Sequence, residues 1–439
     1  MNLSNSANSV NLHLQPTINI GTLGHVAAGK SSLIKSLTGV ATMKHSTELP
    51  RGITIKLGYA NMKIWKCPKC PSPSCYASTS SDILTAECKH CSREQTLVRH
   101  VSFVDCPGHE VLMATMLNGV AVMDGAILVI AGNEECPQPQ TTEHLISAGI
   151  MGLQHMICVQ TKIDLIPELE AQRQFLRIKN FVDGTCANKC PVIPICSQHG
   201  LNLDVVLEYI VNKIPTPIRD VTQAPRMMVI RSFNVNKPGA DITELQGGVV
   251  GGSLQYGKIK LGETLELRPG VVIRDGNNTK CYPLRFKIVS LASEKNPLQE
   301  AVPGGLIAVG TDLDPSLTKD DRMVGNILGA YGHTPSIFRN IKIEYNLMKR
   351  ICSENSNQKV PKPAVGERLR LNVNSMTTHA IITGIVEKCL SLSLDIPVCL
   401  EIGDSIALSR SFEKKWRLIG VGKFQEGTPE PVYSFHKSD

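Results

Sequence analysis

Short aliphatic runs separate longer amphipathic segments over the first half of the chain. The runs have the length of β-strands and lie at Ile18–Leu23, Ser102–Val104, Gly125–Ile130, Met156–Val159 and Val192–Ile195. Between them, Gly29–Leu37 and Thr141–Gly149 have helical length. Because strands that alternate with helices form a parallel sheet covered by helices, we expect an α/β domain with a mostly parallel sheet at residues 17–217.

The pattern changes in the second half, where glycine and proline interrupt short β-branched runs. The segment Ile214–Pro225 contains three prolines in twelve residues, which is typical of an exposed linker. Strands are then predicted at Met228–Val235, Gly247–Leu254, Thr264–Leu267, Val271–Ile273, Phe286–Leu291 and Leu306–Val309. A second series covers Lys342–Tyr345, Arg368–Val373, Thr378–Val386, Ser405–Leu408 and Trp416–Val421. We therefore expect one β-barrel domain at 218–335 and another at 336–439.

Composition agrees with a folded chain of several domains. The 439 residues are 42% hydrophobic and 19% charged, and at about 150 residues per domain they suggest about three domains. Residues 1–16 are rich in Asn and Ser and predict a flexible tail. This N-terminus lacks a basic region followed by an apolar run, and the chain has no apolar stretch of the roughly 18–20 residues that a membrane helix needs. We expect a soluble, cytoplasmic protein with no membrane partner.

Charge and cysteine content narrow the class further. With 46 basic and 39 acidic residues the net charge is +7, which permits a polyanionic partner but is less than a dedicated DNA-binding domain usually carries. The 15 cysteines are an odd number in a long chain without a signal peptide. A disulfide framework is therefore not expected, and the cysteine spacings indicate metal ligands or buried thiols.

A glycine-rich loop follows the first predicted strand. Residues 24–31 have the sequence GHVAAGKS and match G-x-x-x-x-G-K-[ST] between a strand and a helix, the position of a phosphate-binding loop. Backbone N–H groups of such a loop converge on phosphate oxygens, the lysine reaches the β and γ phosphates, and the serine hydroxyl binds Mg²⁺. The competing interpretation is a glycine turn beside a surface lysine. We predict a nucleotide site made of Val26, Ala27, Ala28, Gly29, Lys30, Ser31 and Ser32.

A second motif follows the predicted strand Ser102–Val104. Its sequence, Asp105-Cys106-Pro107-Gly108-His109, suits a carboxylate that holds Mg²⁺ through water and a glycine that turns its amide toward a γ-phosphate. His109 is then expected beside the attacking water, which gives Gly108 and His109 catalytic roles. Asp-x-Pro-Gly is also a common turn, and this is the alternative.

Two further loops are expected to recognise the base. Thr161-Lys162-Ile163-Asp164 ends a predicted strand, and a carboxylate there accepts hydrogen bonds from N1–H and the N2 amino group of guanine. Adenine would leave the charged Asp164 unpaired, at a cost of about 1–3 kcal/mol or more, so GTP and GDP are preferred over adenine nucleotides. Cys196, Ser197 and Gln198 form the last expected loop, where a backbone N–H meets the guanine O6.

Four cysteines have the spacing of a structural zinc site. Cys67, Cys70, Cys88 and Cys91 give the pattern C-x2-C-x17-C-x2-C within an insertion at about residues 65–93. Two such knuckles place four thiolates around one Zn²⁺ and leave no open coordination position, so the ion is expected to be structural. Cys75 and His90 remain competing ligands, and a set of reduced thiols without metal is the alternative.

With these loops in order, the chain resembles the translational GTPases and, more narrowly, the gamma subunits of eukaryotic and archaeal translation initiation factor two. The likeness extends from Thr17 to about Gly422. The segments that carry the resemblance are NIGTLGHVAAGKS, ITIKLGYAN, the cysteine insertion, DCPGH, VNKPGADI, GGVVGGS, VPGGLIAVGT and IALSRSFEKKWRLIG. A generic GTPase would share only the first and fourth of these segments.

The resemblance implies a P-loop GTPase domain with a zinc-knuckle insertion, followed by two β-barrel domains. It also implies a heterotrimer with alpha and beta subunits, GTP-dependent carriage of initiator methionyl-tRNA to the small ribosomal subunit, and GTPase-activating and nucleotide-exchange factors. Thr54 matches the first-switch threonine that closes on Mg²⁺ and the γ-phosphate. The Mg²⁺ ligands are then Ser31, Thr54 and Asp105, and Tyr59 matches a tyrosine that faces the aminoacyl end of the tRNA, with an ordinary half-buried aromatic as the alternative.

The chain departs from the family pattern at several positions. Ala28 replaces the second histidine of GHVAHGKS, and Thr161 replaces the asparagine of NKxD. Threonine keeps a hydroxyl that ties loops together but lacks the amide donor. Gly52 stands in place of an asparagine before the switch threonine, and Cys196-Ser197 replaces Ser-Ala.

Other functions compete with initiation. An elongator-type or selenocysteine-specific tRNA carrier would share the nucleotide loops, but the KLGYAN segment and the cysteine insertion favour initiation. A nucleotide-binding scaffold that does not hydrolyse GTP is disfavoured by His109. A GTP-driven metabolic activator would not bind tRNA. In the initiation hypothesis GTP hydrolysis is slow when the protein is alone and is stimulated by an activating partner.

Overall fold

The computed structural model describes residues 12–42, 54–237, 239, 241, 244–275, 278–348, 359–412 and 415–434. The chain divides into two compact units. The first is Met1–Ile218 with Ser293–Asn296, and the second is Arg219–Ala292 with Pro297–Asp439. Among the described residues, no helix combines the length and the apolar character that crossing a membrane requires.

A mixed sheet forms the centre of the first unit. Its strands are β1 (Ile18–Leu23), β2 (Gly58–Lys66), β3 (Tyr76–Ser80), β4 (Thr96–Asp105), β5 (Gly125–Ala131), β6 (Met156–Thr161) and β7 (Val192–Pro194). In the described part of this unit they lie in the order β3-β2-β4-β1-β5-β6-β7. All pairs from β4 to β7 are parallel, and β2 and β3 are added antiparallel. The predicted mostly parallel sheet is confirmed.

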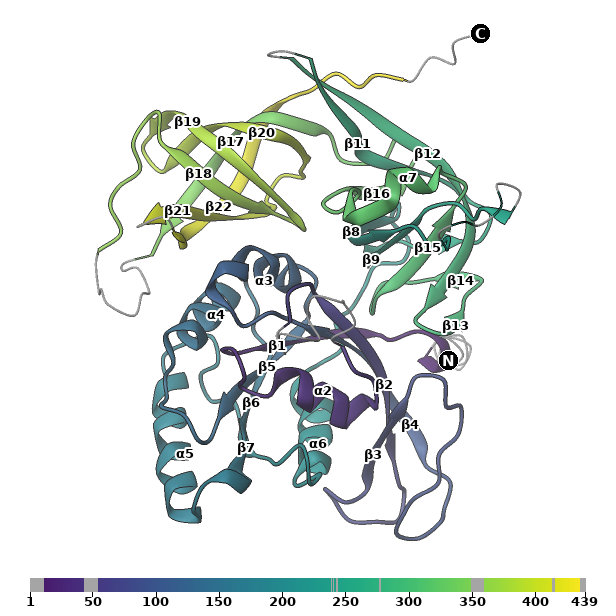
Figure 1. The fold of residues 1–439 in the computed structure, drawn as a ribbon, viewed down its shortest axis with the longest axis vertical. Helices are drawn as coiled ribbons and strands as arrows, with labels where there is room; N and C mark the ends of the chain where they lie inside the picture. The colour runs from purple at the N-terminus through teal and green to yellow at the C-terminus, as the bar shows by residue number, and fades with distance from the viewer. Residues whose placement is uncertain are drawn as a thin grey trace. The chain divides into compact units, whose positions relative to one another are not determined.

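Helices cover both faces of this sheet (Figure 1). They are α2 (Lys30–Thr38), α3 (Met113–Val120), α4 (Pro139–Ile150), α5 (Glu168–Val182) and α6 (Leu203–Lys213), with short 3₁₀ turns η1 (Glu110–Leu112) and η2 (Ile163–Leu165). Helices α2 and α6 share one hydrophobic core with the sheet, and α3, α4 and α5 lie on the opposite face. Because neighbouring strands are parallel, the carboxyl ends of β1, β4 and β6 meet at one edge of the sheet.

Helix α2 shows how the sequence builds this edge. It begins directly after Gly29, whose φ of 95° lets the chain turn sharply from the phosphate loop into the helix. Leu33, Ile34 and Leu37 then face the core at helical spacing. The helix ends at Gly39, which has a φ of 74° and donates its N–H to the Lys35 carbonyl.

The segment before β1 is partly packed. Residues 12–14 form a helical turn, His100 Nδ1 donates to the Leu12 carbonyl at 2.9 Å, and Gln15 is only 2% exposed. Part of the predicted tail therefore packs against the sheet through His100 of β4, and the predicted tail boundary at residue 16 stays a prediction. The rest of that predicted tail lies outside the described residues.

The second unit contains two barrels. The first uses β8 (Arg226–Phe233), β9 (Val249–Tyr256), β11 (Thr264–Asp275), β12 (Asn278–Ser293), β15 (Ile307–Thr311) and β16 (Ile327–Ala330), with short β10 (Ile259–Lys260), β13 (Asn296–Pro297), β14 (Glu300–Ala301), α7 (Pro315–Thr318) and η4 (Lys319–Asp321). In the described residues its order is β11-β16-β8-β9-β15-β12-β13, and pairing of β11 with β12 closes the ring. The predicted first barrel is confirmed.

The second barrel is also closed. Its strands are β17 (Ile337–Leu347), β18 (Arg368–Val373), β19 (Met376–Val386), β20 (Cys389–Cys399), β21 (Ser405–Phe412) and β22 (Lys415–Pro429). They follow the order β17-β20-β19-β18-β21-β22 in the part of the chain that is described. Phe338 and Phe424 meet in its core with ring centroids 4.9 Å apart. A GTPase-like α/β domain followed by two barrels is thus the observed fold, as predicted.

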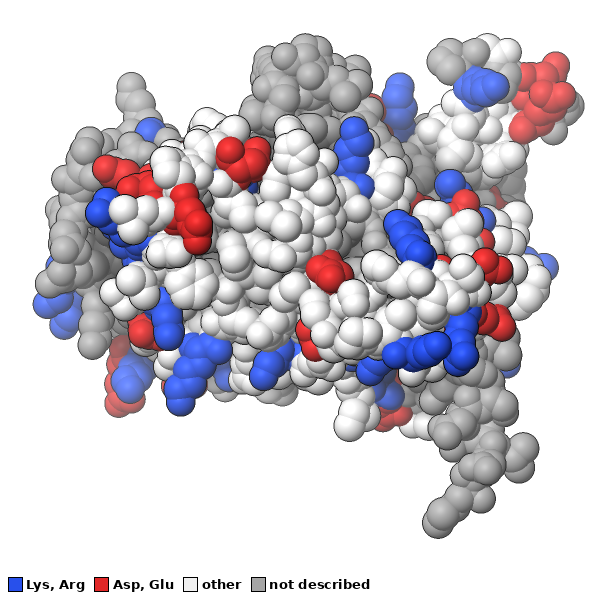
Figure 2. Space-filling view, turned by 90° about the horizontal axis from the view of Figure 1, so that it is seen from below, with Lys and Arg blue, Asp and Glu red and all other residues white. Residues whose placement is uncertain are grey.

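Charges of both signs occur on one side of the molecule (Figure 2). Figure 2 shows one face of the molecule, where Lys and Arg side chains are interspersed with Asp and Glu among uncharged residues. This distribution agrees with the modest net charge of +7.

Candidate functional site

The phosphate loop lies between β1 and α2, and its lysine is held inside it. Lys30 is 6% exposed, and its Nζ donates to the carbonyls of Gly24 and His25 at 2.9 and 2.5 Å. Burial lowers the pKa of Lys30 to about 8, although Asp105 opposes the shift. The ammonium group is therefore fixed inside the loop that the sequence assigns to phosphate binding.

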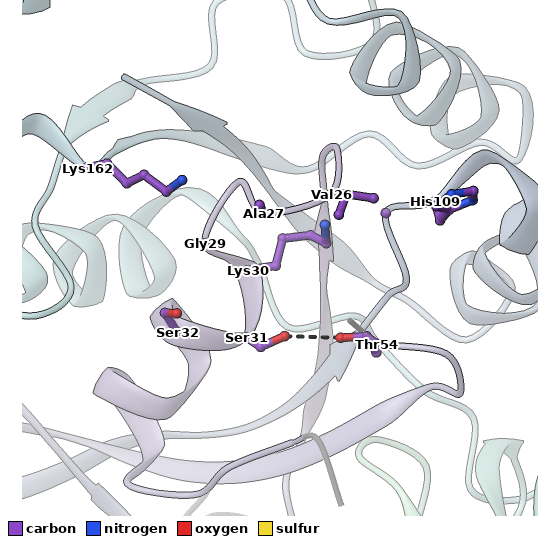
Figure 3. Close-up of a pocket in the computed structure, with 10 residues that line it drawn as sticks. Val26, Ala27, Gly29, Lys30, Ser31, Ser32, Thr54, His109 and Lys162 are labelled. Atoms are coloured by element: carbon purple, nitrogen blue, oxygen red, sulfur yellow. Dashed lines mark hydrogen bonds between the residues drawn. The ribbon is translucent and has the colours of Figure 1, made fainter. Parts of the chain in front are cut away.

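A pocket opens over this loop, and Figure 3 shows its walls. Lys162 projects from one side of the loop, His109 lies on the other, and the hydroxyls of Ser31 and Thr54 face each other. Its lining residues are Val26, Ala27, Gly29, Lys30, Ser31, Ser32, Thr54, Gly108, His109 and Lys162. Every one of them was expected at the nucleotide site, so motifs from four separate stretches of the chain converge here.

Hydroxyl and carboxylate oxygens gather at the proposed Mg²⁺ position. Ser31 Oγ donates to Asp105 Oδ2 at 2.6 Å and lies 3.2 Å from Thr54 Oγ1. The carboxylate of Asp105 is fully buried and also accepts from Thr22 Oγ1 at 3.0 Å and Thr42 Oγ1 at 2.5 Å. Hard oxygen donors of this kind suit Mg²⁺, so the residues present fit the ion that the sequence predicts.

The second switch motif packs directly on the phosphate loop. A Cβ added to Gly108 would lie 2.6 Å from both the His25 backbone and the Lys30 Nζ, so only glycine permits this approach. The next residue, His109, is exposed and lies directly before η1, and its Nδ1 accepts from the Val111 N–H at 3.3 Å. Nε2 is thereby left as the ring nitrogen available to a water or a ligand.

The first base-recognition loop is tied to the phosphate loop. Thr161 is 2% exposed, and its Oγ1 donates to the carbonyls of Ala28 and Ile130 at 2.6 and 3.3 Å. The loop-tying role expected of the threonine hydroxyl is therefore observed. Lys162 follows with a positive φ of 58° and starts η2, which carries Asp164 into an exposed position.

The last loop brings Cys196 against the predicted guanine reader. A hydrogen bond with the Cys196 side chain is the main cause that lowers the pKa of Asp164. Cys196 is buried and pairs with Leu201 through two backbone hydrogen bonds. The Ser197 carbonyl accepts from Ser36 Oγ of α2 at 2.9 Å, and Gln198 is exposed. The predicted base loops thus lie beside each other, and both contact the phosphate-loop region.

Sequence reasoning missed two side chains that contact the phosphate loop, Glu134 and His144. Glu134, between β5 and α4, pairs with His25 and lies 3.9 Å from Lys162 Nζ. His144 of α4 is fully buried, and its Nδ1 accepts from the Gly24 N–H at 3.2 Å. Burial lowers the pKa of His144 to about 3, which keeps this acceptor neutral. Thr22 and Thr42 were also missed, since a lone threonine carries no motif.

The four spaced cysteines form one cluster. Their sulfur atoms all lie within 4.8 Å of one another, with Cys67 and Cys91 3.4 Å apart and Cys70 and Cys88 3.7 Å apart. A tetrahedral ion with Zn–S bonds of about 2.3 Å would hold sulfurs about 3.8 Å apart. The arrangement is compatible with zinc.

The alternative ligands lie outside that group. Cys75 and His90 are both described, and neither belongs to the cluster. The buried Cys75 instead uses its carbonyl to accept from the Cys67 N–H at 2.8 Å. Hydrogen bonds from the N–H groups of Lys69 and Cys70 lower the pKa of Cys67 to about 6, as expected for a knuckle that presents a thiolate.

Two further predictions concern the first switch. Tyr59 is half-buried in β2, opposite Val104 of β4, a position that is compatible with either interpretation of this residue. Gly52 lies outside the described residues.

Two family models match the chain. Residues 15–216 match "Elongation factor Tu GTP binding domain", and residues 339–424 match "Initiation factor eIF2 gamma, C terminal". The first match covers the α/β domain with all the loops described above. The GTPase domain implies GTP or GDP and Mg²⁺ as ligands.

Solved structures of elongation factors share the fold. A bacterial selenocysteine-specific elongation factor matches with a TM-score of 0.69 and 20% identity, covering 94% of this chain and 58% of that one. This chain therefore spans somewhat more than half of that protein's length. Translation elongation factor SelB from Methanococcus maripaludis matches with a TM-score of 0.68 and 20% identity over 95% of this chain and 80% of that one. At this identity the likeness concerns the fold alone.

Curated relatives are much more similar in sequence. "Eukaryotic translation initiation factor 2 subunit gamma" of Schizosaccharomyces pombe is 50% identical over 421 residues, which is 94% of each chain. "Eukaryotic translation initiation factor 2 subunit 3" of Drosophila melanogaster is 51% identical over 430 residues, which is 95% of this chain and 90% of that protein. The chain therefore belongs to the family of gamma subunits of eukaryotic translation initiation factor 2, and it is a GTP-binding translation initiation factor with GTPase activity.

Proposed function

We propose that this chain binds methionylated initiator tRNA in its GTP state, delivers it to the small ribosomal subunit and releases it after GTP hydrolysis. The observation that supports this most directly is the convergence of two switch elements on the phosphate loop. Thr54 lies 3.2 Å from Ser31, and Gly108 packs against the Lys30 ammonium. A γ-phosphate bound at this point contacts both switches, so its loss changes both at once.

The nucleotide contacts follow from the positions of the loops. Backbone N–H groups of residues 26–32 hold the phosphates, and Lys30 neutralises the β and γ phosphates from inside the loop. Asp164 accepts from the guanine N1–H and N2 amino group, while Lys162 packs along the base. The amides of the Cys196-Ser197-Gln198 loop meet the guanine O6. Thr161 stabilises the set by tying the phosphate loop to the end of β6.

Ser31, Thr54 and Asp105 are the proposed Mg²⁺ ligands, with Asp105 acting through water. When bound, Mg²⁺ neutralises charge on the phosphate oxygens. Thr22 and Thr42 keep the Asp105 carboxylate oriented inside the fold through hydrogen bonds to its two oxygens. Gly108 gives an amide to the γ-phosphate, and His109 orients the attacking water. Because His109 is exposed, hydrolysis by the chain alone is expected to be slow until a partner fixes the ring.

The partners and ligands beyond the nucleotide are also proposals. The curated relatives are named as subunits of initiation factor 2, and we infer a heterotrimer with alpha and beta subunits, GTPase-activating and nucleotide-exchange factors, and a cytoplasmic location. We assign structural Zn²⁺ to the cysteine cluster, whose sulfur spacing supports it. Tyr59 is proposed to contact the aminoacyl end of the tRNA. The domain boundaries proposed are 17–217, 218–335 and 336–439.

Filter binding of methionyl initiator tRNA and methionyl elongator tRNA to the full-length chain tests the proposal. We expect initiator tRNA to bind about 5–150-fold more tightly with a GTP analogue than with GDP, since coupling energies of this kind are typically about 1–3 kcal/mol. Thr54→Val should bring the affinity in the GTP analogue close to that in GDP. Thr85→Val, at an exposed threonine outside the pocket, is the matched control and should behave like the wild type.

Equal tRNA affinity in the two nucleotide states would contradict the switch. Binding of elongator tRNA as tightly as initiator tRNA would favour an elongator-type carrier. If GTP is bound but not hydrolysed even with the activating partner present, the non-hydrolysing scaffold would be the better description.

A further inference from the structure

Three side chains of types that can ligate metals lie close together where the two predicted base-recognition loops meet. The carboxylate of Asp164, the thiol of Cys196 and an imidazole nitrogen of His199 all lie within 4.8 Å of one another. Asp164 comes from η2, which follows β6, whereas Cys196 and His199 come from the loop after β7. The parallel pairing of β6 with β7 brings these two loops together.

The backbone holds the cysteine and the histidine on one tight turn. Cys196 and Leu201 exchange hydrogen bonds at 3.3 and 3.0 Å, and Gly200 has a φ of 70°, which permits the chain to reverse. The Cys196 thiol is buried beside Asp164, while Asp164 and His199 are exposed and free to adjust their side chains. Rotation about side-chain bonds is therefore enough to bring the three donors around one ion.

The chemistry of the donors selects the kind of ion. Thiolate and imidazole favour Zn²⁺ over Mg²⁺, which prefers oxygen ligands only. Zinc sites with three protein ligands keep a fourth position open for water. The trio differs in this respect from the four-sulfur cluster of Cys67, Cys70, Cys88 and Cys91, which offers a closed site.

We propose that Asp164, Cys196 and His199 form a second Zn²⁺ site, and that Zn²⁺ and the guanine base compete for Asp164. The competition rests on the proposed guanine-reading role of Asp164; the metal site itself does not. The carboxylate that coordinates an ion has its lone pairs and charge directed to the metal, so it no longer accepts from the guanine N1–H and N2 amino group. Free zinc then inhibits nucleotide binding, and bound nucleotide excludes zinc from Cys196.

Zinc stoichiometry of the full-length chain tests the site. The chain is dialysed against a zinc buffer with excess Mg²⁺, with and without saturating GDP, and the bound zinc is measured by elemental analysis. We expect one more equivalent without GDP than with it. His199→Ala should abolish this extra equivalent, because two remaining ligands bind zinc weakly. His155→Ala, at an exposed histidine of the same unit outside both cysteine-containing groups, should retain it.

Nucleotide competition supplies the second readout. In the wild-type chain, free zinc at nine times its dissociation constant should raise the apparent Kd for GDP about tenfold. The His199→Ala chain should show little change, because His199 takes no part in the proposed guanine contacts. Cys196→Ser should also lose the extra equivalent.

An unchanged zinc stoichiometry on removal of GDP from the wild-type chain would overturn the competition between zinc and GDP, and equal zinc content of the wild-type and His199→Ala chains without GDP would overturn the metal site. An extra equivalent that persists in His199→Ala would overturn it as well, by placing the ion elsewhere. If GDP does not bind at any zinc concentration, including in the absence of zinc, the proposed guanine-binding role of this site is refuted. The difference in zinc content between wild-type and His199→Ala chains without GDP still decides whether the metal site exists.

Discussion

Replacing Thr161 with valine tests what the Thr161 hydroxyl contributes at the position where the motif NKxD has an asparagine. The Thr161 hydroxyl donates to the Ala28 carbonyl at 2.6 Å and to the Ile130 carbonyl at 3.3 Å, in a place where the side chain is 2% exposed. Valine has nearly the same shape but carries a methyl group where the hydroxyl was. The substitution therefore removes the donor while leaving the packing almost unchanged.

The magnitude follows from burial of the acceptor. Loss of a hydrogen-bond partner by a buried polar group costs about 1–3 kcal/mol. For a domain of this size, each kcal/mol lowers the Tm by about 2–4 °C, so a loss of about 2 kcal/mol lowers it by about 4–8 °C. Because Ala28 belongs to the phosphate loop, part of the cost should also appear in nucleotide affinity. If the whole cost of the lost hydrogen bond appeared in nucleotide affinity, the Kd for GDP would rise about 5–150-fold.

Two measurements on the full-length chain separate these effects. Thermal unfolding followed with and without GDP identifies the transition of the nucleotide-binding unit, and titration with a fluorescent GDP analogue gives the affinity. Thr161→Ser keeps the hydroxyl and is the matched control, expected to stay close to the wild type in affinity. If Thr161→Val and Thr161→Ser had the same Tm and the same Kd, the hydroxyl would not tie the loops, and the reasoning would be refuted.

Four further outcomes are expected. Cys91→Ser should lose one equivalent of zinc and make the insertion sensitive to protease, whereas Cys75→Ser should keep the ion; zinc retained by Cys91→Ser would contradict the assigned ligands. Lys30→Met should weaken GDP binding about 10–150-fold, since a hydrogen bond to a charged group is worth about 1.5–3 kcal/mol, as judged by equilibrium dialysis. His109→Ala should slow partner-stimulated GTP hydrolysis about 100-fold or more with little change in GTP affinity, and equal single-turnover rates would exclude its role. Burial lowers the pKa of His100 to about 4, so the unfolded chain binds more protons and stability should fall as pH decreases from 6.5 toward 4; urea unfolding at several pH values measures this slope.

Much of the fold could be predicted because the hydrophobic pattern separates strands from helices in the first half of the chain and repeats short strands in the second half. Strands β1 and β18 have the bounds that the pattern predicts. The predicted strands Thr264–Leu267 and Val271–Ile273 are one strand, β11. The Pro269-Gly270 pair shifts its register instead of ending it, because a bulge accommodates glycine at a φ of 76°.

Other strands were missed for different reasons. Strand β2 is buried at nearly every position, since it lies between two neighbours and has helices on one face, so it shows no alternation of the kind that predicts a strand. Strand β20 does alternate, with Leu390, Leu392 and Leu394 in the core. Its small serines between the leucines gave little β-propensity, although the alternation itself was a sufficient signal.

The residues of the candidate site also fall into two groups: those that a sequence motif predicts and those that only the tertiary structure brings together. The sequence motifs predicted loops whose residues do line one pocket, because phosphate and guanine chemistry restricts which side chains follow a strand, and their binding roles stay predictions. Thr22 and Thr42 contact Asp105 only because β1 and β4 pair in a register that sets Thr22 opposite Asp105 and because the chain after α2 returns to the same point. Such contacts depend on tertiary structure, and a single sequence carries no signal for them.

Thr161 and Cys196, the two residues of the predicted base loops that depart from the family pattern, have separate physical consequences. Thr161 acts inward, since its hydroxyl is buried and joins the phosphate loop to β6. The Cys196 thiol lies beside the Asp164 carboxylate, which is the proposed guanine-reading group. In the proposed guanine site, selectivity rests on Asp164, order of the phosphate loop depends on Thr161, and the proposed sensitivity to soft metal ions depends on Cys196. A family member with asparagine and serine at these positions would keep the selectivity but would lack the thiol donor at the base end of its site.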